Sequence, residues 1–394
     1  MEVREASARY VRATGYRQTE VGVIPEDWSV CRLGQIGQSL IGLTYSPMDV
    51  REYGSLVLRA SNVQNGSIAF DDNVYVDMAL PDRVLVQPND ILICVRNGSR
   101  DLIGKCALLD DRTKGMAFGA FMAVFRSSAN RIVFHHFQSG VVKKQITQHL
   151  GATINQITNA SLNSFLIPLP PTKAEQEAIA EALSDADALI ESLEHLLTKK
   201  RHLKQGAMQQ LLTGKERLPG FSEEWGVKRL GDMLTICHGK SQRGVESADG
   251  PYPILATGGR IGWATRFMYD KPSVLIGRKG TIDQPQYMET PFWTVDTLFY
   301  TVIHESNHAK FLYYRFCLID WKQHNEASGV PSLNARTIEN IQISSPGPEE
   351  QTAIASILSD IDTEIGTLET KLAKARNLKQ GMMQELLTGR IRLV

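Results

Sequence analysis

The sequence predicts an α+β protein in which two mixed α/β globular domains are separated by two long helices that pair as an antiparallel coiled coil. The first observation is a repeat, since residues 172–218 align without a gap to residues 347–393, with about 27 of 47 positions identical. The second is a heptad pattern of apolar residues in both copies. The third is a series of short β-rich runs before each copy. Two matched seams can bury each other, which relates the two halves of the chain by a pseudo-twofold axis.

Each copy is predicted to be one long helix with identifiable ends. Thr172 and Glu175 form a capping box at the first start, and Gly347 takes the equivalent position in the second copy. Gly214 and Gly389 provide the stops. The residues predicted to pair the helices are Ile179, Leu183, Ile190, Leu193, Leu197, Ile354, Leu358, Ile361, Ile365, Leu368 and Leu372. Packed helix faces without chemistry are the plainer interpretation of such a stripe, but the duplication favours mutual pairing.

The remaining sequence is predicted to form the two globular domains. The predicted division is an N-terminal arm (1–20), domain 1 (21–170), a first helical spacer (171–214), domain 2 (215–345) and a second helical spacer (346–394). The predicted strands are 56–58, 74–76, 91–95 and 121–125 in domain 1 and 253–255, 273–276 and 298–303 in domain 2. A helix is expected near 134–149 in domain 1 and near 308–323 in domain 2. The arm is polar and expected to be loosely held.

Composition limits the classes of protein that fit. The chain has 394 residues, with 43 Lys plus Arg and 43 Asp plus Glu, so its net charge is zero. Free-standing nucleic-acid binders are usually more basic, so DNA binding would require segregated charge or a partner. Five single cysteines argue against a zinc ribbon or a disulfide framework. No apolar run reaches the roughly 18 residues of a membrane span, and the N-terminus lacks the apolar core of a signal peptide, so a cytoplasmic protein is expected.

Gly, Asn and Arg cluster in the loops between the predicted strands. Arg, Asn and Gln can make bidentate hydrogen bonds to guanine and adenine, and Gly lets the backbone approach phosphate. The candidate DNA-binding residues are Arg59, Asn62, Gln64, Arg96, Asn97, Arg100 and Lys105 in domain 1 and Lys240, Gln242, Arg243, Arg260, Arg278 and Lys279 in domain 2. Solvated turn residues are the alternative interpretation of any single loop.

Motifs for catalysis are weak. His304 to His308 spells HExxH, but a zinc site needs both histidines on one helix, and His304 ends a strand-like run. Ser306 or Asn307 is the expected cap of the helix that follows. Residues 239–244 have P-loop spacing without the Lys-Ser/Thr that must follow. We therefore predict no catalytic residue and no metal ligand.

Residues 15–28 (GYRQTEVGVIPEDW), the repeated Glu-Gln helix start and the repeated LKQGxMQxLLTG motif resemble the specificity subunit of type I restriction-modification systems along the whole chain. The resemblance implies a non-catalytic subunit in which two target-recognition domains alternate with two conserved helical regions. It implies recognition of a bipartite, asymmetric double-stranded DNA site and assembly with two methyltransferase subunits and, in the full complex, two restriction subunits. The complex would be an adenine-N6 methyltransferase and ATP-dependent endonuclease, with S-adenosylmethionine, ATP and Mg bound by the partner subunits and no cofactor bound by this chain.

Two other classes of function stay open at this point. A coiled-coil adaptor that joins two protein-binding domains would share the architecture but show no sequence-dependent DNA binding. A zinc peptidase rests only on His304 and His308. The sequence does not reveal the DNA target, the spacer length, which domain reads which half-site, or whether a restriction subunit is present.

Overall fold

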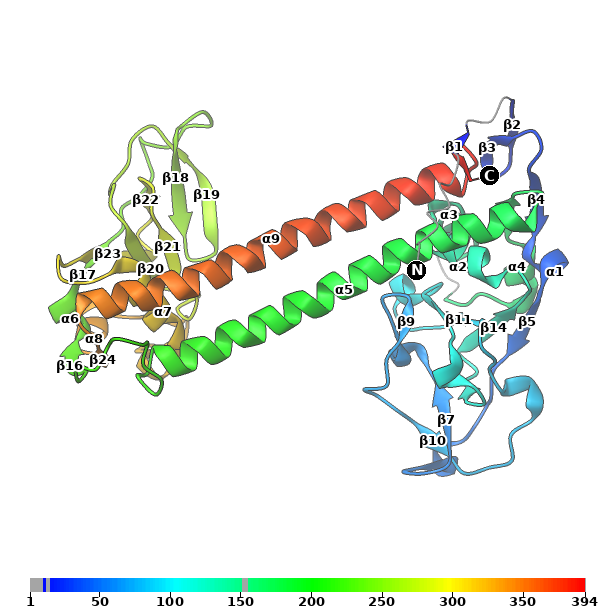
Figure 1. The fold of residues 1–394 in the computed structure, drawn as a ribbon, viewed down its shortest axis with the longest axis horizontal. Coiled ribbons are helices and arrows are strands. Elements are labelled where there is room, and N and C mark those ends of the chain that lie inside the picture. The colour runs from blue at the N-terminus through cyan, green and yellow to red at the C-terminus, as the bar shows by residue number, and fades with distance from the viewer. Residues whose placement is uncertain (1–9, 12–14, 151–154, 394) are drawn as a thin grey trace. The chain divides into compact units, whose positions relative to one another are not determined.

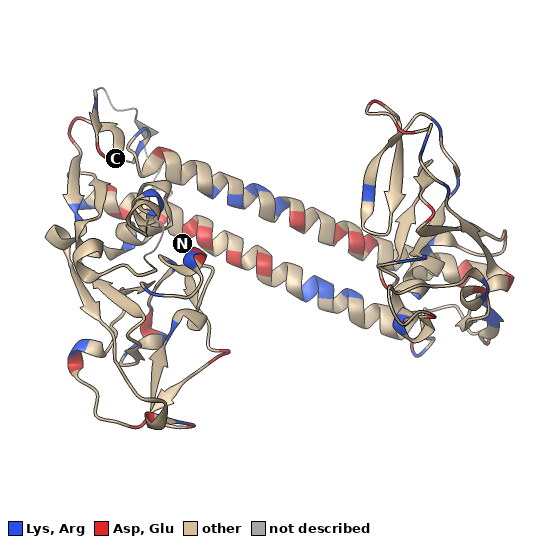
Figure 2. Cartoon of the chain, turned by 180° about the vertical axis from the view of Figure 1, so that it is seen from behind, with Lys and Arg blue, Asp and Glu red and all other residues tan. Residues whose placement is uncertain are grey.

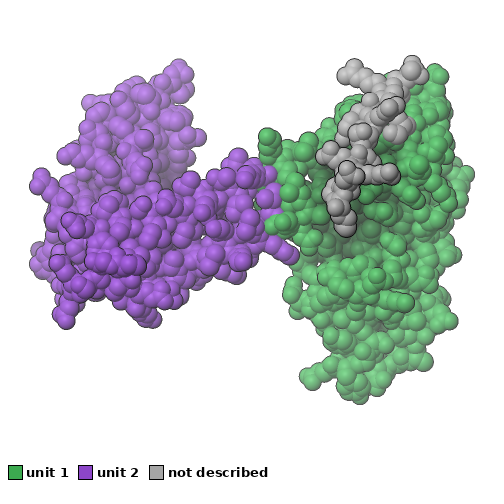
Figure 3. All heavy atoms as spheres, in the orientation of Figure 1, with its two compact units in different colours: residues 1–192, 372–394 green, residues 193–371 purple. Residues whose placement is uncertain are grey.

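A computed structural model of the chain describes residues 10–11, 15–150 and 155–393. The chain divides into two compact units, shown in Figure 3: unit 1 is residues 1–192 with 372–394, and unit 2 is residues 193–371. Each unit holds one globular domain together with part of each long helix. The compact units therefore divide both helices, whereas the sequence suggested spacers distinct from the domains.

The two long helices are α5 (Lys173–Leu211) and α9 (Pro348–Leu386), labelled in Figure 1. The Thr172 hydroxyl accepts a hydrogen bond of 3.2 Å from the backbone amide three residues further on, as expected for an N-cap. Gly214 and Gly389 have φ of 71° and 70°, the left-handed conformation that ends a helix and favours glycine. Both predicted helices and their glycine stops are confirmed, whereas only the Thr172 half of the predicted capping box forms.

In unit 1 the central sheet is antiparallel and has the order β12-β11-β14-β5. Its strands are β5 (Gln38–Ile41), β11 (Ile91–Cys94), β12 (Cys106–Leu108) and β14 (Met122–Arg126). A second sheet, in the order β13-β7-β10-β6, contains β6 (Val50–Arg51), β7 (Ser55–Leu58), β10 (Tyr75–Val76) and β13 (Ala117–Phe118). The shorter pairs are β1 (Tyr10–Val11) with β25 (Arg392–Leu393), β2 (Tyr16–Thr19) with β3 (Gly22–Pro25), β4 (Ser29–Arg32) with β15 (Leu166–Leu169), and β8 (Val63–Gln64) with β9 (Ser67–Ile68). The helices of domain 1 are α1 (Leu33–Ile36), α2 (Asn130–Gln138), α3 (Gly140–Leu150) and α4 (Asn159–Ser164).

In unit 2 the central sheet is again antiparallel, with the order β17-β23-β20-β21. Its strands are β17 (Leu234–His238), β20 (Ser273–Gly277), β21 (Gln286–Met288) and β23 (Leu298–Ile303). A second sheet contains β18 (Tyr252–Ala256), β19 (Gly259–Ala264) and β22 (Trp293–Thr294), and β16 (Gly226–Arg229) pairs with β24 (Gln342–Ser345). The helices are α6 (Leu230–Met233), α7 (Ala309–Leu318) and α8 (Ala335–Glu339).

The two domains share one topology. Taken in chain order, β5, β11, β12 and β14 of domain 1 occupy the same sheet positions as β17, β20, β21 and β23 of domain 2. Domain 1 additionally contains α3, β6 and the β8–β9 pair, for which the fully described residues 215–345 show no counterpart. The repeat seen in the helices therefore extends to the domain folds, and each domain is mixed α and β, as predicted.

Three local predictions need correction. The helix expected at 134–149 is two helices, α2 and α3. Ser139, the C-cap of α2, has an extended backbone with ψ of 161°, which separates them. The helix expected at 308–323 stops at Leu318, where Ile319 turns extended, and a 3-10 turn follows at Trp321–His324. The described part of the N-terminal arm is built into unit 1, since β2 pairs with β3 and β1 pairs with β25; residues 1–9 and 12–14 of the arm lie outside the described residues.

The predicted helix-pairing residues are all buried or half-buried. In unit 1 Ile179 and Leu183 are buried with Leu386, and in unit 2 Ile354 and Leu358 are buried in a cluster with Leu211. These clusters also contain the cores of the adjoining domains, so the ends of the seam pack against domain and helix together. The remaining members are half-buried (Ile190, Leu193, Ile361, Ile365 and Leu368) or buried (Leu197 and Leu372).

Ion pairs between the helices show their antiparallel direction. In unit 1 the Lys379 Nζ lies 2.5 Å from the Asp187 Oδ1, and in unit 2 the Lys204 Nζ lies 2.6 Å from the Asp362 Oδ1. Asp362 and Lys379 stand 175 positions after Asp187 and Lys204, so the two pairs are repeat equivalents with the helices exchanged. Both lysines interrupt the heptad pattern, and the structure explains the interruption as a cross-helix ion pair. No helix among the described residues is long and apolar enough to cross a membrane.

Candidate nucleic-acid interface

Loops that are distant in sequence meet at one edge of the central sheet of domain 1. The backbone amides of Val95 and Arg96, after β11, donate to the Phe121 carbonyl oxygen at 3.0 and 3.1 Å. The amide of Leu43, after β5, donates to the Phe118 oxygen at 2.7 Å, and that of Ile157 donates to the Val95 oxygen at 2.8 Å. We call residues 42–45, 95–100, 119–121 and 156–157 loop edge 1.

Domain 2 repeats this arrangement bond for bond. The amides of Arg278 and Lys279 donate to the Thr297 oxygen at 2.8 and 3.3 Å, and the amide of Lys240 donates to the Thr294 oxygen at 2.9 Å. The amide of Leu333 donates to the Arg278 oxygen at 2.9 Å. We call residues 239–243, 278–283, 294–297 and 332–333 loop edge 2. The match makes Arg96 equivalent to Lys279 and Phe121 equivalent to Thr297.

One glycine in each loop edge permits the close approach of two segments. A Cβ added at Gly42 would lie 2.2 Å from the carbonyl oxygen of Gly119, and one added at Gly239 would lie 2.0 Å from that of Val295. Any side chain at either position would therefore displace the backbone of the facing segment. The loop edges are a property of the backbone frame, on which the other side chains can vary.

The comparison with known proteins identifies the family. Residues 25–200 and 222–376 match the family described as the type I restriction modification DNA specificity domain. The chain belongs to this family.

Related specificity subunits match along most of the chain or about half of it. Over 433 residues, 98% of both chains, this specificity subunit is 25% identical to the putative type I restriction enzyme MjaX specificity subunit of Methanocaldococcus jannaschii. Over 253 residues, 59% of this chain and 54% of the other, it is 30% identical to the type I restriction enzyme EcoKI specificity subunit of Escherichia coli K12. The crystal structure of the type I restriction-modification S subunit from M. genitalium has the same fold, with a TM-score of 0.68, 17% identity, and coverage of 91% of this chain and 96% of that one.

Most of the predicted DNA-binding residues of this specificity subunit gather at the loop edges. Loop edge 1 contains Arg96, Asn97 and Arg100, with Lys105 at the far end of the same β11–β12 connection; loop edge 2 contains Lys240, Gln242, Arg243, Arg278 and Lys279. Asn97 shapes its loop, because its side-chain oxygen accepts a 2.9 Å bond from the Ser99 amide. Arg278 donates to the Asp296 carbonyl oxygen at 3.2 Å. Whether each residue contacts DNA stays a prediction.

Charge is segregated although the total is zero. Figure 2 shows that acidic residues lie mainly in the N-terminal half and basic residues mainly in the C-terminal half of each long helix, and Lys200 with Glu364 and Arg201 with Glu369 form ion pairs between the helices. Within the described part of the chain, by contrast, the exposed Arg96, Lys240, Arg243 and Lys279 make no ion pair. The loop edges thus present positive charge, which suits phosphate.

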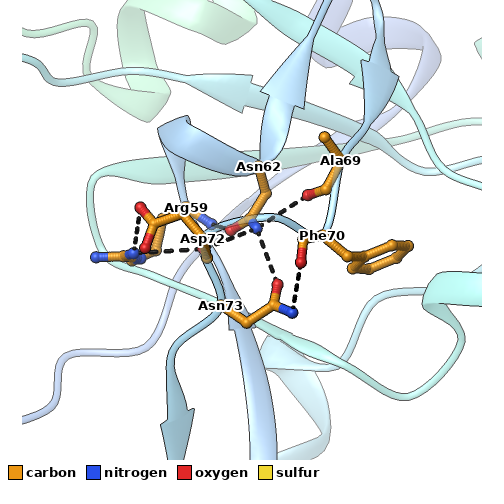
Figure 4. Close-up of polar contacts among 6 residues, drawn as sticks. All are labelled: Arg59, Asn62, Ala69, Phe70, Asp72 and Asn73. Carbon is orange, nitrogen blue, oxygen red and sulfur yellow. Dashed lines mark hydrogen bonds and ion pairs between the residues drawn. The ribbon is translucent and has the colours of Figure 1, made fainter. Parts of the chain in front are cut away.

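Besides Lys105, four candidates lie outside the loop edges, and one of these four requires correction. Figure 4 shows Asn62 at the end of a 3-10 turn, fully buried, where its amide donates to the carbonyl oxygens of Ala69 and Asp72 at 3.1 Å each. Its oxygen accepts from the Arg59 amide at 2.9 Å. The structure therefore does not support Asn62 as a base-contacting residue, because its hydrogen-bonding groups hold the loop together. Arg59 is partly engaged as well, with its guanidinium 2.9 Å from the Asp72 carboxylate.

The other two outlying candidates are exposed. Gln64 stands on β8, and Arg260 on β19 places its guanidinium 4.5 Å from the centroid of the Trp263 ring. Neither is joined to a loop edge by a contact seen in the described residues. They stay candidates for separate contacts.

His304 and His308 do not form a metal site in the described structure. His304 follows β23 and its two ring nitrogens lie 3.1 Å from the Asp232 oxygen and the Thr235 hydroxyl. His308 is the N-cap of α7, in place of the expected Ser306 or Asn307, and accepts a bond from the Phe311 amide. The two imidazoles therefore share no helical face, and the described residues contain no group of three or more His, Cys, Asp or Glu placed to hold a metal ion.

Sequence reasoning missed Phe121. The sequence predicts Phe121 as the first residue of a strand, but β14 begins at Met122 and Phe121 lies in loop edge 1 with 59% of its surface exposed. The Arg96 guanidinium lies 5.1 Å from the centroid of its ring. An apolar residue at the boundary of a strand gives no sequence signal that it faces solvent.

Proposed function

We propose that this specificity subunit reads a bipartite, asymmetric DNA site, with loop edge 1 on one half-site and loop edge 2 on the other. The observation that carries the proposal is the pair of matched loop edges with unlike side chains. Leu43 and Arg96 of domain 1 are replaced by Lys240 and Lys279 in domain 2. One backbone frame with different chemistry would present two different sequences of donors and apolar groups to base edges.

Exchanging one domain is expected to change one half of the target only. Residues 35–170 would be replaced by the equivalent segment of a relative whose methylated motif is known, and the chain would be expressed with its methyltransferase subunit. Methylome sequencing should show the relative's half-site joined to the unaltered second half-site. Changes in both halves would contradict one domain per half-site, and an unmethylated genome with the unaltered chain would contradict DNA reading by this complex.

We further propose that two methyltransferase subunits dock on repeat-equivalent surfaces of α5 and α9. Leu203 and Leu378 are 53% and 60% exposed, and each is followed one helical turn later by a glycine, Gly206 or Gly381. An added Cβ at either glycine would meet nothing within 4 Å. Glycine within a helix destabilises it by about 1 kcal/mol relative to alanine, and no packing within this chain requires glycine at either position. The repeated glycine would instead allow the backbone of a partner to approach the helix closely.

Substituting Leu203 by Glu is expected to reduce the number of bound methyltransferase subunits from two to one, and substituting both Leu203 and Leu378 should leave none. Native mass spectrometry of the co-expressed complex measures the ratio. Gln205→Glu is the matched control, because it adds the same charge at an exposed position about 200° around the helix. Retention of two subunits by the double variant would refute this surface.

In this proposal the chain supplies no catalytic residue. The methyltransferase subunits bind S-adenosylmethionine and methylate adenine, and the restriction subunits, where present, use ATP and Mg to cleave. The specificity subunit contributes the position on DNA.

A further inference from the structure

We propose that Phe121 is a DNA-contacting residue that positions Arg96, so that the phenyl ring and the guanidinium read DNA as one unit. The inference rests on the proposed function, since it assigns a base contact within loop edge 1. It concerns a residue outside the set predicted from Arg, Asn and Gln chemistry.

Phe121 is an exposed aromatic residue in loop edge 1. Met122, which follows it, is buried, whereas Phe121 is 59% exposed and stands with the exposed Ala120 at the rim of a loop edge rich in polar groups. Exposing a phenyl ring forgoes about 25 cal/mol for each Å² of apolar surface that burial would remove from water. A ring in this place regains that free energy when a ligand covers it.

Arg96 contacts Phe121 through both its backbone and its side chain. Its backbone amide is bonded to the Phe121 carbonyl oxygen, and it forms an antiparallel β-bridge with Gln156 on its other side. Its guanidinium lies over the Phe121 ring, 5.1 Å from the centroid. Backbone and side chain of Arg96 are thus both held before DNA arrives.

The side-chain N–H donors of Arg96 are available to a ligand. Other arginines of domain 1 are engaged with carboxylates: Arg112 with Asp110 at 2.8 Å and Arg126 with Asp90 at 2.6 Å. Arg96 makes no side-chain hydrogen bond or ion pair with the described residues. Its five N–H donors are therefore free to form the bidentate pair with guanine O6 and N7.

The exposed Phe121 ring and the oriented Arg96 guanidinium predict which bases the half-site contains. An arginine that is already stacked loses less conformational entropy when it binds than a mobile one, which raises affinity without adding a contact. The ring edge beside it suits the C5-methyl group of thymine. We expect the half-site read by domain 1 to contain a guanine beside a thymine, contacted by Arg96 and Phe121 respectively.

Domain 2 lacks this device at the equivalent place. Thr297 replaces Phe121, and Lys279 replaces Arg96. A lysine is a flexible point charge without a planar guanidinium, so Lys279 would approach a base without the orientation that the Phe121 ring gives Arg96. The difference makes the two half-sites chemically unlike at equivalent positions.

The test measures DNA binding by the complex of this chain with its methyltransferase subunits, on a duplex carrying the motif found by methylome sequencing. Phe121→Ala and Arg96→Ala should each weaken binding about tenfold or more, and the double variant should be no weaker than Arg96→Ala within about threefold. Phe121→Tyr, which keeps the ring, should bind within about threefold of the unaltered chain. Phe121→Leu, which keeps apolar volume without a ring, should be about as weak as Phe121→Ala.

Controls separate this inference from the proposed function. Tyr53→Ala removes an aromatic that is 62% exposed but lies outside loop edge 1, and it should leave binding unchanged. Wild-type affinity in Phe121→Ala, or in Phe121→Leu, would overturn the inference while DNA reading stands. The inference would also be overturned if the double variant bound DNA more weakly than Arg96→Ala and a 2-aminopurine in the half-site became unstacked. That result would mean that Phe121 inserts between bases and does not position Arg96. Absence of sequence-dependent binding by the unaltered complex would instead overturn the proposed function.

Discussion

Lowering the pH from 7.5 to 5.0 is expected to reduce the free energy of unfolding of unit 1 by about 2 to 4 kcal/mol, because two histidines of α2 are buried in their neutral form. His135 and His136 are 1% and 0% exposed. Burial lowers the pKa of both to about 3, and the Lys379 ammonium contributes to the lower pKa of His135. In the unfolded chain both titrate near 6.5.

The direction follows from proton binding. Between pH 3 and 6.5 the unfolded chain binds more protons than the folded chain, so stability is complete above pH 6.5 and falls as the pH decreases. Each histidine contributes about 1.4 kcal/mol per pH unit in this range, or about 2 kcal/mol at pH 5. The Asp187 carboxylate lies 3.9 Å from the His135 ring and favours the charged form of the imidazole. The loss of stability expected from His135 is therefore smaller than that expected from His136.

Denaturant unfolding across this pH range provides the measurement, and domain 2 provides a matched variant. The Tyr314 hydroxyl lies 2.7 Å from the Asp362 carboxylate and 3.5 Å from the Ser359 hydroxyl. Asp362 and Ser359 are the repeat equivalents of Asp187 and Ser184, and the Ser184 hydroxyl lies 3.3 Å from the His135 ring. His135→Tyr should therefore retain the contacts and remove about half of the pH dependence. A stability that is constant from pH 7.5 to 5.0 would show that the two histidines take up protons in the folded chain as they do in the unfolded chain.

Replacing Glu175 by Ala is expected to destabilise unit 1 by about 3 kcal/mol, because it leaves a largely buried arginine without its main partner. Glu175 is 2% exposed, and its carboxylate binds Arg392 in a bidentate pair in which Nη2 and Oε2 are 2.7 Å apart. Arg392 lies over the Trp28 ring, at 5.7 Å from its centroid, and the exposed Asp27 is its one remaining carboxylate partner among the described residues when Glu175 is removed. The hydrogen bond to Glu175 is the main cause of the raised pKa of Arg392.

Glu369→Ala is the matched control. Its partner Arg201 is 57% exposed, and exposed ion pairs contribute about 1 kcal/mol or less. Unfolding in denaturant, followed by the tryptophan fluorescence of the whole chain, should show a large shift for Glu175→Ala and a small one for Glu369→Ala. Equal shifts would mean that the Arg392 cluster is solvated and that the C-terminal segment is held by other contacts.

The same cluster shows where local sequence signals stop. The spacing of Thr172 and Glu175 predicts a capping box with bonds in both directions, but only the Thr172 hydroxyl makes its bond. The Glu175 carboxylate turns to Arg392, which is 217 positions away. A charged partner in the fold outcompetes a local backbone amide because a charge-assisted bidentate pair is stronger than a single neutral donor.

The sequence by itself determined the helices, their ends and the duplication, because caps, heptads and stop glycines act within a few residues of one another. It also determined that the interruption at Lys204 recurs at Lys379. Only the tertiary structure decided what these lysines do, since their partners Asp362 and Asp187 stand on the other helix. Charge pairs across elements leave no periodic signal in either element.

The candidate interface divides in the same way. The composition of the loops indicated Arg96, Lys240 and Lys279, because residue type alone defines what can bond to a base or a phosphate. The sheet order decided which loops meet. The ends of β5 and β11 and the start of β14 are far apart in sequence and come to one edge only after the strands pair. Packing then decided exposure: it buried Asn62 inside its own turn and left Phe121 beside Arg96, because burial depends on what the rest of the chain places around a residue.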